Sequence, residues 1–209
     1  MPKITNLQLR LGRVDRFVVN LEDGQELVFT PESVAQFGIT PNKEFSDNEF
    51  LEILKLDGIR QAKDQAMRLL ALRPHSRSEL IRKMRERGYR LEVIEQALDE
   101  LEKLNLVNDE DFVKVFIQNE LRLRPVGRML LRQKLLARGI VPEVFEPLLK
   151  DLYTTEQEIQ VARQLCEKFR RTHSEENKRK SREKLVRFMQ GKGFTWEQIR
   201  QVMGLTPEE

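Results

Sequence analysis

Few residues in this sequence could carry out catalysis or bind a metal. The chain has one cysteine, Cys166, and two histidines, His75 and His173. A single thiol excludes an internal disulfide and any multi-cysteine zinc site, and it fits a reducing compartment. Two histidines give acid–base or metal chemistry little to work with. We therefore expect a cytoplasmic protein that has no cofactor and no metal.

The short motifs that resemble catalytic sites have simpler explanations. Gly191-Lys192-Gly193 lacks the spacing and the preceding strand of a phosphate-binding loop. Asp109-Glu110-Asp111 suggests a cation site, but acidic residues commonly open a helix because they complement its dipole. Cys166 and Trp196 fall where packing is expected. The sequence predicts no enzymatic activity.

Basic residues cluster in three stretches and indicate a surface for a polyanion. Residues 121–142 contain six basic residues and no acidic one that could neutralise them: Arg122, Arg124, Arg128, Arg132, Lys134 and Arg138. Residues 73–90 hold seven basic residues, including Arg82 and Lys83, against two acidic ones. Residues 163–192 hold eleven, including Arg171, Lys178, Arg179 and Lys180, against four. We expect these residues to contact DNA phosphates or an acidic protein; the alternative is that they only solvate helices.

The composition is that of a soluble globular chain with an uneven charge distribution. Of the 209 residues, 39% are hydrophobic and 34% charged, and the mean hydropathy is −0.55. No apolar run approaches the ~20 residues that a membrane span needs. Residues 1–57 carry six basic and ten acidic residues, whereas residues 58–209 carry 31 and 24. A polyanionic partner is therefore expected to meet the C-terminal part.

The N-terminal residues predict a small β element, which we call the head. Residues 16–21 and 25–30 flank Asp23-Gly24, and such a pair between apolar runs predicts a hairpin. A short helix is expected from Pro31 to Gly38, and a capping box, Ser46 to Glu49, opens the next helix. The head lies outside the repeats, so a chain starting near Lys43 is expected to remain folded.

From residue 57 onward the sequence repeats. A shift of 51 residues places residues 57–101 on residues 108–152, and a further shift of 54 reaches the C-terminal segment. The second helix of each unit is expected to begin at Ser76, Gly127 and Ser181 and to stop at Gly88, Gly139 and Gly193. The first helices are expected to follow N-caps at Asp57, Asn108 and Thr155. Such periods predict a helical array.

The predicted fold is mainly α, with three tandem three-helix units in an elongated array and a small N-terminal head that contains a β-hairpin. The domain boundaries that we expect are 1–45 for the head, 46–104 for the first unit with its leading helix, 105–153 for the second and 154–209 for the third.

The repeat segments resemble the RecX family, small bacterial regulators of the RecA recombinase. The similarity covers roughly residues 58–205. It is carried by the residues 72–80 followed by Arg87-Gly88-Tyr89, by residues 106–112, by the arginine-rich stretch to Arg138-Gly139-Ile140, and by residues 193–199.

The resemblance implies a non-enzymatic role in DNA repair, recombination and the SOS response. It implies binding to RecA and its filament on single-stranded DNA, with inhibition of recombinase and coprotease activity as the expected effect. Double-stranded DNA is a further candidate partner; a monomer and no membrane association are expected. Two alternatives stay open: a stand-alone DNA-binding protein of helix-turn-helix type, and a helical protein-interaction scaffold.

Overall fold

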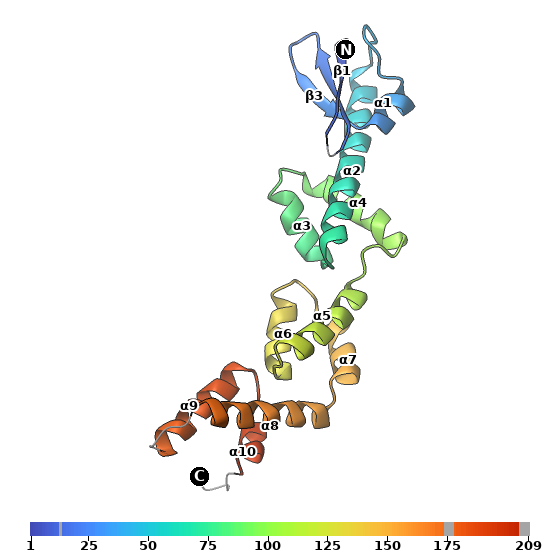
Figure 1. Cartoon of the computed structure of the whole chain (residues 1–209). Helices are drawn as coiled ribbons and strands as arrows, with labels where there is room; N and C mark the ends of the chain where they lie inside the picture. The colour runs from blue at the N-terminus through green and yellow to red at the C-terminus, as the bar shows by residue number, and fades with distance from the viewer. Residues whose placement is uncertain (13, 174–177, 205–209) are drawn as a thin grey trace. The chain divides into compact units, whose positions relative to one another are not determined.

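The computed structural model describes residues 1–12, 14–173 and 178–204, which form ten helices and a three-stranded antiparallel sheet (Figure 1). The chain divides into two compact units. The N-terminal unit comprises Met1–Arg73 and Leu80–Val107, and the C-terminal unit comprises Pro74–Glu79 and Asn108–Glu209. The predicted fold class, mainly helical with three three-helix units and a hairpin-containing head, is confirmed.

The head is built on the predicted hairpin. Strands β1 (Ile4–Arg10), β2 (Arg16–Leu21) and β3 (Glu26–Phe29) form the sheet in that order. Gly24 has a φ of 86°, and its N–H donates to the carbonyl of Leu21 over 3.1 Å. A residue without a side chain is favoured at this positive φ. Asp-Gly therefore supplies the turn between β2 and β3.

Helix α1 (Pro31–Phe37) is followed by α2 (Asp47–Leu72), which is longer than the sequence predicted. The capping box of Ser46 and Glu49 opens α2, and the helix then continues unbroken through Asp57. Asp57 is therefore not an N-cap, and that prediction was wrong. Its buried carboxylate instead accepts hydrogen bonds from the backbone N–H and the hydroxyl of Thr30, at 2.8 and 2.7 Å.

Each of the three three-helix repeats, which are smaller than the two compact units, has its own apolar core. The first repeat combines α2 with α3 (Arg77–Arg85) and α4 (Leu91–Lys103). The second consists of α5 (Asp109–Leu123), α6 (Arg128–Leu136) and α7 (Pro142–Leu152). The third consists of α8 (Thr155–Thr172), α9 (Lys178–Gly191) and α10 (Trp196–Met203). The cores centre on Leu80, Met84 and Leu98; on Leu131, Leu135 and Phe145; and on Cys166, Met189 and Ile199.

Side-chain caps fix most of the helix starts. Asn108 accepts from the N–H groups at the start of α5, and Thr195 forms a capping box with Gln198 at α10. Two predicted starts were displaced. The cap of α8 is Thr154 rather than Thr155, and α9 begins at Lys178, so that Ser181 lies inside the helix.

The second helix of each unit ends in the same geometry. Gly88, Gly139 and Gly193 have φ values of 87°, 74° and 84°. The residue after each glycine donates to a carbonyl five residues earlier, from Tyr89 to Met84, Ile140 to Leu135, and Phe194 to Met189, over 3.2–3.3 Å. This is the hydrogen-bond pattern of a Schellman motif, which needs a left-handed residue at the glycine position.

Within the C-terminal unit, two hydrogen bonds join one repeat to the next, and the residues that form them occupy equivalent positions in their repeats. The Ser76 hydroxyl donates to the carbonyl of Arg138, and the Gly127 N–H donates to the carbonyl of Lys192, both over 2.8 Å. The shifts of 51 and 54 residues superpose these two pairs. The start of a second helix therefore bonds to the residue before the glycine stop of the next repeat.

Within the described part of the chain, no helix has the length and apolar character to cross a membrane.

Candidate nucleic-acid interface

The basic residues singled out in the sequence divide between the two units. Arg82 and Lys83 lie on α3 in the N-terminal unit, and the others belong to the C-terminal unit. The side chain of Lys178 lies outside the described residues. That the three basic stretches form a surface for a polyanion stays a prediction.

Arg128 is held by the end of α7 and the start of α8. Its N–H donates to Glu158 Oε1 over 2.7 Å, and its Nε lies 3.6 Å from Glu158 Oε2. The guanidinium also donates twice to the carbonyl of Tyr153, from Nε over 2.9 Å and from Nη2. Glu158 is 3% exposed, so Arg128 supplies this buried carboxylate with a positive charge and a backbone N–H donor.

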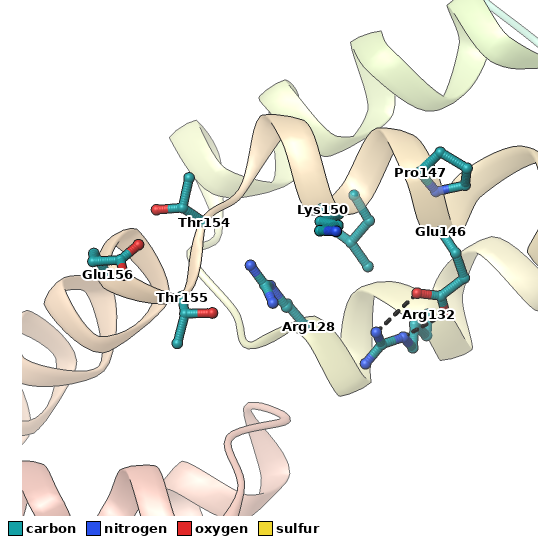
Figure 2. A pocket seen from close by; sticks show the side chains of 9 residues that line it. Arg128, Arg132, Glu146, Pro147, Lys150, Thr154, Thr155 and Glu156 are labelled. Atoms are coloured by element: carbon teal, nitrogen blue, oxygen red, sulfur yellow. Dashed lines mark hydrogen bonds and ion pairs between the residues drawn. The ribbon is translucent and has the colours of Figure 1, made fainter.

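Arg132 forms a bidentate ion pair with Glu146 of α7. The Nε–Oε1 and Nη2–Oε2 distances are 2.6 and 2.8 Å, and Figure 2 shows the two side chains pointing toward each other. The hydrogen bond raises the pKa of Arg132 and lowers the pKa of Glu146. Both side chains are 41% exposed, so solvent screens the pair.

A hollow of about 630 Å³ lies beside this pair (Figure 2). Its lining carries three basic and two acidic residues, namely Arg128, Arg132, Lys150, Glu146 and Glu156. Because the charges nearly balance and the arginines already have carboxylate partners, the hollow offers little excess potential to an anion.

Lys134 and Arg138 are also engaged within the C-terminal unit. Lys134 forms an ion pair with Glu120 of α5. The Nη1 of Arg138 donates to the carbonyl of Lys134 over 2.9 Å, and its Nε lies 3.6 Å from Glu79 Oε1. The guanidinium also lies over the ring of Phe116, 4.4 Å from the centroid. Both side chains thus hold neighbouring elements together.

The expectation that nothing neutralises the acid-free stretch was therefore wrong. Residues 121–142 contain no carboxylate, but four of their cations meet carboxylates from other segments. These partners lie far away in the sequence, so a scan along the chain does not find them. The pairs are Arg128–Glu158, Arg132–Glu146, Lys134–Glu120 and Arg138–Glu79.

Arg122 and Arg124 lie at the C-terminal end of α5 and are exposed. The Nη2 of Arg122 donates to Asn119 Oδ1 over 3.3 Å, a neutral partner that leaves its charge uncompensated. Within the acid-free stretch, these two arginines are the ones placed to meet a phosphate.

The basic residues at the end of α8 and the start of α9 are highly exposed. The side chain of Arg171 is 82% exposed and lies 4.0 Å from Glu167, whereas that of Arg179 is 90% exposed and lies 3.3 Å from Glu183. Lys180 is exposed as well. Ion pairs this exposed are weak, so a polyanion can compete for these cations.

Sequence reasoning missed three residues of this region: Arg182, Arg187 and Trp196. They line a second hollow together with Arg179. Trp196 was expected to pack, but 47% of its surface is exposed. Arg179, Arg182 and Arg187 lie at i, i+3 and i+8 along α9, and this spacing could have placed the two missed arginines on one helix face. Trp196 lies on α10, so this spacing does not reach it.

The remaining candidate chemistry has structural explanations. Across residues 1–12, 14–173 and 178–204, no group of three or more His, Cys, Asp and Glu side chains could hold a metal ion. Asp109 accepts the N–H of Arg77 over 2.8 Å and so caps the start of α3, and burial raises the pKa of Asp109. Cys166 is 1% exposed, and burial raises the pKa of its thiol.

Comparison with known proteins finds similarity to RecX domain models and to proteins named regulatory protein RecX. The family model described as the first three-helix domain of RecX matches residues 62–101, and the model of the third three-helix domain matches residues 156–203. The chain is 36% identical over 146 residues to the regulatory protein RecX of Chlorobaculum tepidum, covering 69% of this chain and 87% of the relative. It is 29% identical over 198 residues to the regulatory protein RecX of Lactococcus lactis subsp. cremoris (strain SK11), covering 94% of this chain and 73% of the relative.

Two solved structures share the fold. A crystal structure of a regulatory protein RecX matches with a TM-score of 0.71 at 20% identity, covering 98% of this chain and all of that one. The crystal structure of RecX from Lactobacillus salivarius matches with a TM-score of 0.64 at 22% identity, covering 71% of this chain and 96% of that one.

Proposed function

Because the chain belongs to the RecX family of regulatory proteins, we propose that it binds the RecA recombinase and its filament on single-stranded DNA and inhibits the recombinase and coprotease activities. In this proposal the protein acts as a monomer and without catalysis of its own. An array of helical units that bridges neighbouring RecA subunits would block filament assembly or favour disassembly.

The observation that carries this proposal is the exposed basic surface of α9. The helix holds six basic residues against one acidic residue, Glu183. The side chains of Arg179 and Arg187 are 90% and 75% exposed. A surface of this charge attracts the phosphates of a filament-bound strand, or those of duplex DNA, and releases counterions when it binds.

The candidate residues fall into two roles in this proposal. One group contacts phosphates or acidic groups of the filament: Arg82, Lys83, Arg122, Arg124, Arg171, Lys178, Arg179 and Lys180. The paired ones, Arg128, Arg132, Lys134 and Arg138, position the helices that present them. This division replaces the hypothesis that all of the cations of residues 121–142 bind directly.

Co-sedimentation with RecA filaments tests the proposal. Filaments are assembled on single-stranded DNA with a non-hydrolysable ATP analogue, and the chain is added at increasing concentration. We expect saturable recovery in the pellet with filaments, and weaker recovery with the same DNA alone. Equal recovery on DNA without RecA would favour a stand-alone DNA-binding protein. No recovery in either case, at concentrations that saturate a RecX relative, would refute the proposal.

A further inference from the structure

Trp196 and the arginines of α9 line one hollow of the C-terminal unit. The hollow has a volume of about 570 Å³, and its lining comprises Arg179, Arg182, Glu183, Val186 and Arg187 from α9 and Trp196 from α10. Three of the six lining residues are arginines, and the indole forms the apolar part of the lining together with Val186.

Local structure holds Trp196 in this position. It is the first residue of α10, directly after the N-cap Thr195, whose side chain forms a capping box with Gln198. Its neighbours Phe194 and Ile199 are 3% and 0% exposed and belong to the core of the third unit, whereas Trp196 is 47% exposed. Two buried anchors on either side thus fix the backbone of a large aromatic residue whose ring the core does not use.

The hollow that Trp196 lines also contains an acidic residue, Glu183, between two of the arginines of α9. Glu183 lies 3.3 Å from Arg179 and 3.9 Å from Arg187, so it spaces these two guanidinium groups along α9. The lining of the hollow holds one carboxylate and three arginines, and Glu197 follows Trp196 in the first turn of α10. The side chains of Arg179 and Arg187 are 90% and 75% exposed, so solvent weakens their pairs with Glu183 and a phosphate can compete for them.

An exposed aromatic face beside arginines has the two components that recognise single-stranded nucleic acid. Every base has a π-face that stacks on an aromatic ring, and arginine binds phosphate and can stack on bases. A duplex presents phosphates but keeps the faces of its bases stacked inside. The combination therefore favours a single strand over a duplex.

We infer that Trp196 stacks on a base of single-stranded DNA while Arg179 and Arg187 bind the flanking phosphates. The inference rests on the proposed action at a RecA filament, because it names the part of the filament that this site contacts. In this inference the third repeat contacts the bases of the DNA strand as well as its phosphates.

Intrinsic fluorescence tests the inference directly, because Trp196 is the single tryptophan of the chain. The full chain is titrated with a thymidine oligonucleotide, with an abasic deoxyribose-phosphate oligomer of the same length, and with free thymidine monophosphate at the same base concentration. Stacking predicts saturable quenching by the oligonucleotide alone. Equal quenching by the abasic oligomer, or none by the oligonucleotide, would overturn base stacking. Equal quenching by the monophosphate would indicate a nucleotide site instead.

Variants provide a second readout through the anisotropy of a labelled oligonucleotide. Replacing the ring by an aliphatic side chain, Trp196→Leu, is expected to weaken binding by about 5- to 150-fold, the range for loss of one stacked base. Trp196→Phe keeps an aromatic face and is expected to retain most of the affinity. The matched control is Leu104→Ala, an exposed apolar residue of the N-terminal unit that is 64% exposed. Equal affinities of Trp196→Leu and the parent would also overturn the inference.

Failure of this inference is distinguishable from failure of the proposed function. If the parent and Trp196→Leu both co-sediment with RecA filaments while fluorescence stays unquenched, the regulatory proposal stands and base stacking is wrong. If the parent fails to co-sediment but its fluorescence is quenched by the oligonucleotide, base stacking stands without RecA. The melting temperature of each variant shows whether it is folded.

Discussion

The buried carboxylate of Glu158 accepts the backbone N–H of Arg128 at 2.7 Å and lies 3.6 Å from the guanidinium of the same residue. One side chain therefore both caps the start of α6 and pairs with its first residue. Asp109 likewise caps the start of α3, where it accepts the N–H of Arg77. In both cases an acidic residue early in the first helix of one repeat accepts a hydrogen bond from the first backbone N–H of the second helix in the preceding repeat.

This relationship predicts that Arg128 is needed for stability. Arg128→Ala removes the positive charge beside the carboxylate of Glu158, which is only 3% exposed, and the two donors to the carbonyl of Tyr153. We expect a loss of about 3 kcal/mol in the free energy of unfolding, because it leaves a buried charge without its ionic partner. Urea unfolding followed by circular dichroism measures this. Arg132→Gln is the control, since its pair is half exposed and should matter much less. Equal losses for the two variants would contradict the account.

The ion pair of Arg132 with Glu146 predicts a dependence on pH. The pair lowers the pKa of Glu146 in the folded state, so the folded state holds fewer protons there than the unfolded state. Its stabilisation is present above the ordinary carboxyl pKa of about 4.3 and is lost as the pH falls through the folded-state value. Unfolding at a series of pH values should show the difference between the parent and Arg132→Gln shrinking toward acid. A difference that is constant with pH would argue against the pair.

Close approach, and not only backbone conformation, requires glycine at position 139. A Cβ there would lie 2.4 Å from the Cβ of Ser78, whereas a Cβ on Gly88 would meet nothing within 4 Å. Both residues have positive φ, so Gly88→Ala isolates the conformational effect, about 1 kcal/mol.

Gly139→Ala should lower the free energy of unfolding by at least about 1 kcal/mol more than Gly88→Ala does, because of the added overlap. Adding Ser78→Gly should recover that excess. Thermal melts of the three variants measure it, and indistinguishable midpoints for Gly88→Ala and Gly139→Ala would refute the close contact.

The head contributes to the stability of α2. The carboxylate of Asp57 is the acceptor for the N–H and hydroxyl of Thr30, which is 1% exposed, and the head shares a core with Phe50 and Ile53 of α2. Asp57→Ala should lower the free energy of unfolding by about 2 kcal/mol, since it leaves buried donors unsatisfied. The exposed Glu52→Ala in the same helix is the control. A chain starting near Lys43, first expected to stay folded, should be destabilised because it exposes this core.

Local signals made much of the fold predictable, and long-range pairing made the rest unpredictable. The capping box of Thr195 and Gln198 lies within four residues, so its meaning does not depend on the tertiary fold. Asp57 carries the same local signal as an N-cap, but its partner Thr30 is 27 residues away. The carboxylate of Glu146 likewise meets Arg132 only after α6 and α7 pack together.

The exposed arginines of α5 should contribute to salt-dependent binding. Reversing both, Arg122→Glu with Arg124→Glu, should weaken binding to single-stranded DNA and lower the salt slope, because fewer counterions are released. Helicity should remain, since both residues are exposed. Arg10→Glu, an exposed arginine of the acidic head, should leave the slope unchanged. Identical slopes for the double reversal and the parent would remove α5 from the interface.

The measurement that tests the central claim most directly is ATP hydrolysis by RecA on single-stranded DNA, with and without the chain. If the chain regulates RecA by binding its filament, hydrolysis should fall as its concentration rises and level off at saturation. The double reversal of Arg122 and Arg124 should shift that curve to higher concentration. Hydrolysis that stays at the level of RecA alone, at a chain concentration above that of RecA, would contradict the account.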